Sequence, residues 1–208
     1  TLKRASAVLA VRASAVLAVL TATTVSATAF EQIKGGVFEQ VSNITLSKDA
    51  QRSLNRFRRD NAAYGAYFVS ADGSDWAWYG GLFSQADADK SAKALCEVDA
   101  GAPCTLFARI TPGNAVGKVA MPASERAGLR EALRDTTSGR FGALAAYPLG
   151  GWGSGFDFDT AEGARERATL ECAAAAADDR AGEDSDVRKA FDRNRLYDCK
   201  VVHVFQKQ

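Results

Sequence analysis

Few side chains of this sequence could do chemistry beyond charge: the only histidine is His203, and there are four cysteines and three tryptophans. His203 stands among alternating apolar residues typical of a half-buried strand, and the sequence marks no nucleophile or acid beside it. Ser154 has Trp152 two residues before it, where the nucleophile elbow of hydrolases requires glycine. We therefore expect no catalytic residue and no cofactor. An enzyme using His203 and a carboxylate stays an alternative.

Aromatic residues form a second group of candidates. Trp76, Trp78 and Tyr79 cluster in the first half of the chain, and Trp152 stands near the corresponding point of the second half. Positions 76 and 78 share one face of an expected strand, so their rings could stack on sugars or contact a partner. Aromatics spaced by two residues more often bury against a helix, and this is the interpretation that we favour for the two tryptophans.

An internal repeat shows which elements must position these residues. Tyr64-Gly65-Ala66 corresponds to Phe141-Gly142-Ala143 at an offset of 77 residues. At an offset of 76, a run of small residues after a hydroxyl residue repeats: Ser84, Ala88, Ala92 and Cys96 correspond to Thr160, Ala164, Ala168 and Cys172. Each copy is one supersecondary unit.

Both copies predict the order strand, turn, strand, helix, strand. The expected strands are 64–70, 75–80 and 104–110 in the first copy, and 141–147, 152–158 and 199–205 in the second. Ser84 and Thr160 are expected to cap the helices, and charged helices are expected to begin near Ser47 and Ser124. In the last strand, strict alternation would place Val201, His203 and Phe205 on one face and Val202 and Val204 on the other.

The repeat also selects a cysteine pairing. Four cysteines allow three pairings, and only Cys96–Cys104 with Cys172–Cys199 treats the two copies alike. A zinc site is not expected, because spacings of 8 and 27 residues lack the close pairs of zinc knuckles and ribbons.

These elements predict an α+β fold of two related strand-strand-helix-strand units, each with a preceding helix and an internal disulfide, arranged as one pseudo-symmetric domain. The expected divisions are an N-terminal arm at 30–46, a first unit at 47–111, a linker at 112–123 and a second unit at 124–208. We interpret the arm as irregular. The acidic insertion at 176–195 is expected to be a solvated loop, because it lacks the residue order of a calcium-binding EF-hand loop.

Residues 1–29 contain three basic residues, no acid, an apolar centre and Ala27-Thr28-Ala29 at the end, which is typical of a secretory signal peptide. A retained membrane anchor is the alternative. Without this segment, 23 basic residues face 25 acidic ones. That balance gives no basic surface for nucleic acid or for a membrane. We expect a periplasmic or secreted protein, in which cysteines pair.

The glycine-bearing turn, the helix of small residues and the two cysteines resemble the exported bacterial family DUF4189, which is uncharacterised. Gly80 to Cys104 and Phe158 to Cys199 carry the resemblance, which implies export but no catalytic residue. Residues 81–95 also look like the strand-to-helix junction of peptidoglycan-binding SPOR domains.

Together these features predict a non-catalytic, disulfide-stabilised interaction or accessory module of the bacterial envelope, whose partner is an envelope protein or a membrane complex. The alternative is a module that binds peptidoglycan or another glycan. The surface expected to meet the ligand or partner comprises Trp76, Trp78, Tyr79 and Trp152. Membrane contact is expected only if residues 1–29 are retained.

Overall fold

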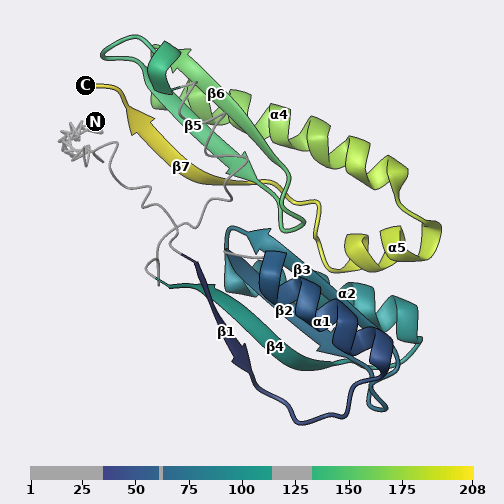
Figure 1. Cartoon of the computed structure of the whole chain (residues 1–208). Coiled ribbons are helices and arrows are strands. Elements are labelled where there is room, and N and C mark those ends of the chain that lie inside the picture. The colour runs from purple at the N-terminus through teal and green to yellow at the C-terminus, as the bar shows by residue number, and fades with distance from the viewer. Residues whose placement is uncertain (1–34, 61–62, 114–132) are drawn as a thin grey trace, which may run out of the picture.

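The computed structural model describes residues 35–60, 63–113 and 133–208, which form two α+β units with one antiparallel sheet each (Figure 1). The strand order is β1-β4-β2-β3 in the first sheet and β6-β5-β7 in the second. Both units contain the expected succession of strand, strand, helix and strand, so the predicted α+β class is confirmed.

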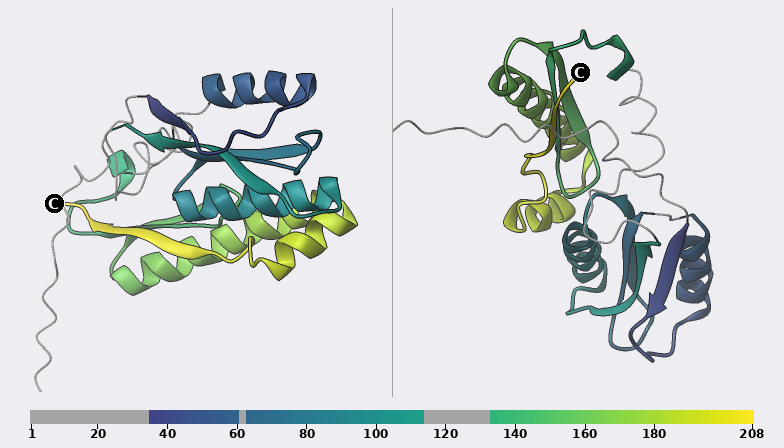
Figure 2. Two further views of the ribbon diagram at one scale, coloured as in Figure 1. Left: turned by 90° about the horizontal axis from the view of Figure 1, so that it is seen from below. Right: turned by 90° about the vertical axis from the view of Figure 1, so that its left-hand side faces the viewer.

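The first unit spans β1 to β4. Its elements are β1 (Gly36–Gln40), α1 (Lys48–Asp60), β2 (Tyr64–Val69), β3 (Trp76–Leu82), α2 (Gln85–Ala100) and β4 (Thr105–Pro112). Helices α1 and α2 cover opposite faces of the sheet (Figure 2). Two apolar clusters result: α1 packs on Tyr67 and Ile110, whereas α2 packs on Ala66 and Phe68.

The second unit repeats the central part of this plan. Its elements are β5 (Phe141–Ala146), β6 (Trp152–Phe158), α4 (Ala161–Gly182), α5 (Ser185–Arg193) and β7 (Lys200–Gln206). Helix α4 covers one face of the sheet, as α2 does in the first unit.

The strand registers of the two units correspond residue by residue. Ala66 pairs with Tyr79 and Arg109, and the equivalent Ala143 pairs with Gly155 and Val204. The offsets are 77 residues from β2 to β5, 76 from β3 to β6 and 95 from β4 to β7, and they place both register irregularities at the same points of each sheet. The arrangement as a single pseudo-symmetric domain stays a prediction.

One of these irregularities corrects the predicted faces of the last strand. The register shifts where Leu144 pairs with His203 and Ala145 with Val201, so the alternation reverses there. Val204 packs with the α4 cluster, and Val201 lies beside α4. Val202 packs with Phe205 on the opposite face, where His203 stacks on Phe205 with ring centroids 5.9 Å apart.

The helix caps, small-residue stripes and disulfides agree with the sequence. Ser84 Oγ accepts from the amide of Asp87, and Thr160 Oγ1 accepts from that of Gly163, each at 3.1 Å. The six stripe positions are fully buried, which lets each helix lie close to its sheet: Ala88, Ala92, Cys96, Ala164, Ala168 and Cys172. The disulfides are Cys96–Cys104 and Cys172–Cys199, so the predicted pairing is confirmed.

Two expectations about irregular segments were wrong. The N-terminal arm contains strand β1, which pairs antiparallel with β4 because the outer edge of β4 offers unpaired amides and carbonyls. The acidic insertion is not a loop: α4 continues to Gly182 and α5 follows. Within this segment Arg180 forms an ion pair with Asp192 at 2.7 Å, and Ala176, Ala190 and Phe191 are buried.

Apolar residues of α5 and of the segment after it join the two units. Phe191 of α5 and the following Leu196 are fully buried and pack with Ala94 of α2. Ser91 of α2 donates a hydrogen bond of 3.2 Å to the carbonyl oxygen of Pro148, just after β5. Figure 2 shows α5 beside α2 at the junction.

The predicted signal peptide, the helix start near Ser124 and most of the predicted linker lie outside the described residues. Within the described ranges, no helix is both long enough and apolar enough to cross a membrane.

Candidate binding groove

A groove of about 320 Å³ lies beside the first half of β3 and the last turns of α2. Strand β3 is an edge strand of its sheet, so in the described structure one side of its backbone pairs with no other strand. The lining residues come from the turn before β3, from β3 itself and from α2: Ser74, Asp75, Trp76, Ala77, Trp78, Leu95 and Asp99.

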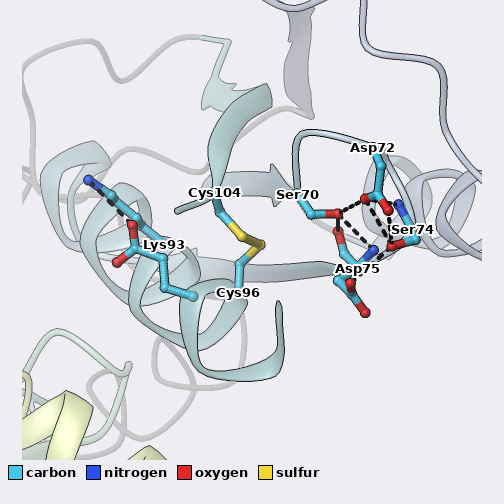
Figure 3. Close-up of a disulfide and its surroundings, with 8 residues drawn as sticks. Ser70, Asp72, Ser74, Asp75, Lys93, Cys96 and Cys104 are labelled. Atoms are coloured by element: carbon cyan, nitrogen blue, oxygen red, sulfur yellow. Dashed lines mark hydrogen bonds and ion pairs between the residues drawn. A yellow bond between two sulfur atoms is a disulfide. The ribbon is translucent and has the colours of Figure 1, made fainter. Parts of the chain in front are cut away.

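The turn between β2 and β3 carries Asp75, which lines the groove, and Figure 3 shows its hydrogen bonds with Ser70 and Ser74. Ser70 Oγ donates to Asp72 Oδ1 at 2.7 Å and accepts from the Asp75 amide at 3.0 Å. The hydrogen bond from Ser70, followed by those from Ser74, lowers the pKa of Asp72. Gly73 adopts a φ of +72°, and a Cβ there would stand 2.1 Å from a backbone oxygen, so only glycine fits this turn.

The two tryptophans are anchored in the scaffold as well as lining the groove. The indole Nε1 of Trp78 donates to Ser53 Oγ of α1 at 3.1 Å, and its ring lies 5.7 Å from that of Phe57. Trp76 stacks on Tyr67 with centroids 6.1 Å apart and planes 14° apart. Both tryptophans are half-buried, so each has one side in the α1 core and some surface left for a ligand.

The groove is electronegative. Burial, and next the charge of Asp75, raises the pKa of Asp99. Asp99 stands in the last turn of α2, where the helix dipole adds negative potential. No ion pair between described residues reaches either carboxylate, so within the described ranges these two negative charges have no cationic partner.

A second hollow of about 570 Å³ occupies the corresponding place in the other unit, between β6 and α4. Its lining is Trp152, Gly153, Ser154, Arg167, Glu171, Ala174, Ala175 and Asp178. Trp152 corresponds to Trp76 at the repeat offset, but Arg167 and Glu171 form an ion pair across the helix surface. The second hollow therefore already contains a cation for one of its acids.

The other sequence candidates lie elsewhere. Tyr79 faces α2 and packs against Phe191 with ring centroids 6.3 Å apart, and its burial at this junction raises its pKa. His203 is half-buried in β7, and burial lowers its pKa. The structure thus brings Trp76 and Trp78 together and places Tyr79, Trp152 and His203 apart from them. Among the described residues, no three His, Cys, Asp or Glu side chains gather as metal ligands would.

Sequence reasoning missed the polar half of the groove. Asp75 directly precedes Trp76. Asp99 follows Leu95 by four residues, so Leu95 and Asp99 lie on one side of α2. Those spacings are weak signals, because only the β2–β3 hairpin and the helix together bring Asp75 and Asp99 to one opening.

Comparison with protein-family models, with curated proteins and with solved structures finds no match to this chain.

Proposed function

We propose that this chain is an exported, non-catalytic interaction module whose first unit binds a cationic, extended segment of an envelope partner protein. The observation that carries the proposal is the groove itself, where two indoles and two carboxylates line an open sheet edge.

Each part of the groove suits one part of such a segment. The backbone of β3 can add an extended peptide as a further strand. The carboxylates of Asp75 and Asp99 complement a lysine ammonium or an arginine guanidinium, and indole rings attract the same cations. Asp99 is exposed at the groove, desolvation and next the charge of Asp75 raise its pKa, and a bound cation would favour its ionised form.

The rest of the chain supports an exported role. Two disulfides brace the units, one beside the groove, and structural disulfides persist in oxidising compartments. Periplasmic or secreted location is accordingly part of the proposal.

A glycan, above all peptidoglycan, is the second candidate ligand. Aromatic rings and carboxylates also bind sugars, through ring stacking and through hydrogen bonds from hydroxyl groups. Trp76 and Trp78 favour this candidate, but each is half-buried and has a ring neighbour in the core, so a smaller part of each ring is open than in a flat sugar platform.

Calorimetric titration with extended peptides tests the proposal. We expect a Lys-containing peptide to bind and its Glu-containing counterpart not to bind, and we expect Asp75→Asn with Asp99→Asn to weaken binding about tenfold or more, as the loss of charge-assisted hydrogen bonds does. Asp178→Asn in the second hollow is the matched control and should leave binding unchanged.

A pull-down with murein sacculi decides between the two ligands. Sacculus binding that survives the double Asn variant, with no peptide binding, would overturn the protein-partner proposal in favour of a glycan. Equal affinity for the Lys and Glu peptides would overturn the role of the carboxylates.

A further inference from the structure

The outer edge of β7 differs from the outer edge of its counterpart β4. In the first sheet β4 lies between β1 and β2, whereas within the described ranges β7 pairs with β5 alone. Among the described residues, no strand lies at the edge of the second sheet that corresponds to the place of β1 in the first (Figure 1).

Apolar side chains are exposed beside this edge. Val201 of β7 is 39% exposed and Leu170 of α4 is 66% exposed. Together with Glu162, Arg165, Glu166 and Thr169 they line a hollow of about 570 Å³ between α4 and β7. An open edge next to exposed aliphatic residues is a site for strand addition.

Strand β1 shows what such an edge accepts. Phe38 lies opposite Ile110, and Glu39 lies opposite Arg109, which is held by Asp89 of α2 at 3.0 Å. The amide of Val41 extends the pairing by donating to the Phe107 carbonyl at 2.9 Å.

The sequence contains a second copy of this strand motif. Phe30-Glu31-Gln32-Ile33 repeats Phe38-Glu39-Gln40-Val41 at an offset of eight residues. An even offset preserves which side chains share a face of an extended strand.

We propose that residues 30–33 of one molecule add as an antiparallel strand to the β7 edge of a second copy. In the register of β1, Phe30 lies opposite Phe205 and Glu31 opposite Val204. Ile33 then lies beside Val201 and covers the exposed aliphatic surface.

Charge complementarity supports this register. Arg165 of α4 occupies the repeat position of Asp89, which in the first unit holds the residue opposite Glu39. Glu31 of the added strand therefore meets Arg165, which forms an ion pair with Glu162 of its own helix at 3.4 Å.

The donor is a second copy rather than the same chain. The Gly113 amide donates to the Gly35 carbonyl at 3.1 Å, so only Lys34 separates Ile33 from the pairing of the first sheet. Two residues span at most about 7 Å, so Ile33 can lie no farther than this from Gly35 of the first unit, whereas β7 belongs to the second unit. Donor and acceptor surfaces differ, so the contact is head-to-tail, and repeating it builds either a ring or a chain of copies.

Another segment of the same chain is a weaker occupant. Residues 113–117 stand at the repeat offset from β1 and read Gly-Asn-Ala-Val-Gly. Glycine and asparagine are depleted in strands, and no aromatic residue is present to meet Phe205.

Sedimentation velocity of the protein purified from the cell envelope tests the proposal. Mass spectrometry of the same sample identifies its first residue. We expect oligomers that grow with concentration. Phe30→Asp, and separately Val201→Asp, should raise the concentration for half assembly at least about tenfold, as loss of a buried anchor does. Val37→Asp changes an exposed aliphatic residue of the first unit and serves as the control, with assembly unchanged.

A charge exchange tests the register without depending on folding. Glu31→Arg and Arg165→Glu should each weaken assembly, and the double variant should restore it. Hydrogen exchange should show the amides of β7 protected only at concentrations where the oligomer forms.

Two results would overturn the proposal. One is a chain that stays monomeric at every concentration with exchanging β7 amides. The other is a monomer whose β7 amides are protected, which would identify a segment of the same chain as the occupant.

Discussion

In the first unit the hollow beside the edge strand is lined by Trp78, Leu95 and Asp99, and the equivalent positions of the second unit hold Ser154, Glu171 and Ala175. The backbone that builds the two hollows is the same to the residue in strand register. The side chains differ, and they separate a groove with two tryptophans and two carboxylates from a hollow in which Arg167 already forms an ion pair with Glu171.

The two units also differ in what covers their helices. Ala94 of α2 is 4% exposed because α5 packs on it, whereas Leu170, its counterpart on α4, is 66% exposed. The inserted helix α5 of the second unit thus covers α2 of the first unit, whereas Leu170 on the equivalent surface of α4 is exposed. The two units share the repeated strands and helix, and the inserted segment of the second unit makes them differ.

The largest expected effect comes from removing the ring that joins the units. Phe191→Ala should lower the free energy of unfolding by about 3–5 kcal/mol, because a fully buried ring leaves a cavity. Denaturant unfolding followed by tryptophan fluorescence measures it. Leu170→Ala, at the exposed counterpart surface, should stay within about 0.5 kcal/mol. Equal losses for the two variants would refute the asymmetry.

The disulfides should rank by the length of chain that they close. Cys172–Cys199 spans 27 residues and Cys96–Cys104 spans 8. Replacing each pair by serine should cost about 3.6 and about 2.5 kcal/mol respectively, because the longer loop restricts the unfolded chain more. Thermal unfolding of the two double variants compares them. A larger loss in the first unit would show that native contacts, not loop length, decide the order.

A smaller contrast tests how closely each helix approaches its sheet. A Cβ on Gly153 of β6 would stand 2.0 Å from the Cys172 backbone nitrogen, whereas the equivalent position in β3 is the buried Ala77. Gly153→Ala should cost about 1–3 kcal/mol through overpacking, and the reverse change Ala77→Gly about 0.5–1 kcal/mol. Unfolding curves of the two variants give both values. A neutral Gly153→Ala variant would mean that α4 can move away without cost.

Much of the scaffold could be predicted from the sequence because its signals are local. Ser84 and Thr160 mark helix starts by their spacing, and the small-residue stripes mark the buried helix faces. The cysteine pairing followed from the repeat. Each of these features needs only one segment and its copy to be recognised.

The parts that were wrong depend on contacts between distant segments. In the sequence, Phe191 is a single apolar residue in an acidic stretch, and only the folded structure shows that it packs with Ala94. Strand β1 forms by pairing with the outer edge of β4. The reversed alternation at Val202 depends on the pairing of β7 with β5. The carboxylate half of the groove likewise needs α2 and the β2–β3 turn to meet.

The finest contrast between the two units is a titration. Burial, and then the charge of Asp75, raises the pKa of Asp99 above its ordinary 3.8, while the equivalent Ala175 carries no charge. The folded protein therefore holds the Asp99 proton more tightly than the unfolded chain does. The stability that this proton contributes is lost as pH rises from 3.8 through the folded-state pKa.

Asp99→Asn should remove this dependence of stability on pH and stabilise the protein at pH 7 by less than about 0.5 kcal/mol, because the side chain is exposed to solvent. Unfolding measured from pH 3 to pH 7 for both proteins gives the difference curve. Asp75→Asn should reduce the slope without abolishing it, since burial is the larger cause. A difference curve of the opposite sign would mean that a cation inside the protein already pairs with Asp99, and the groove would then have no unmet charge to offer a ligand.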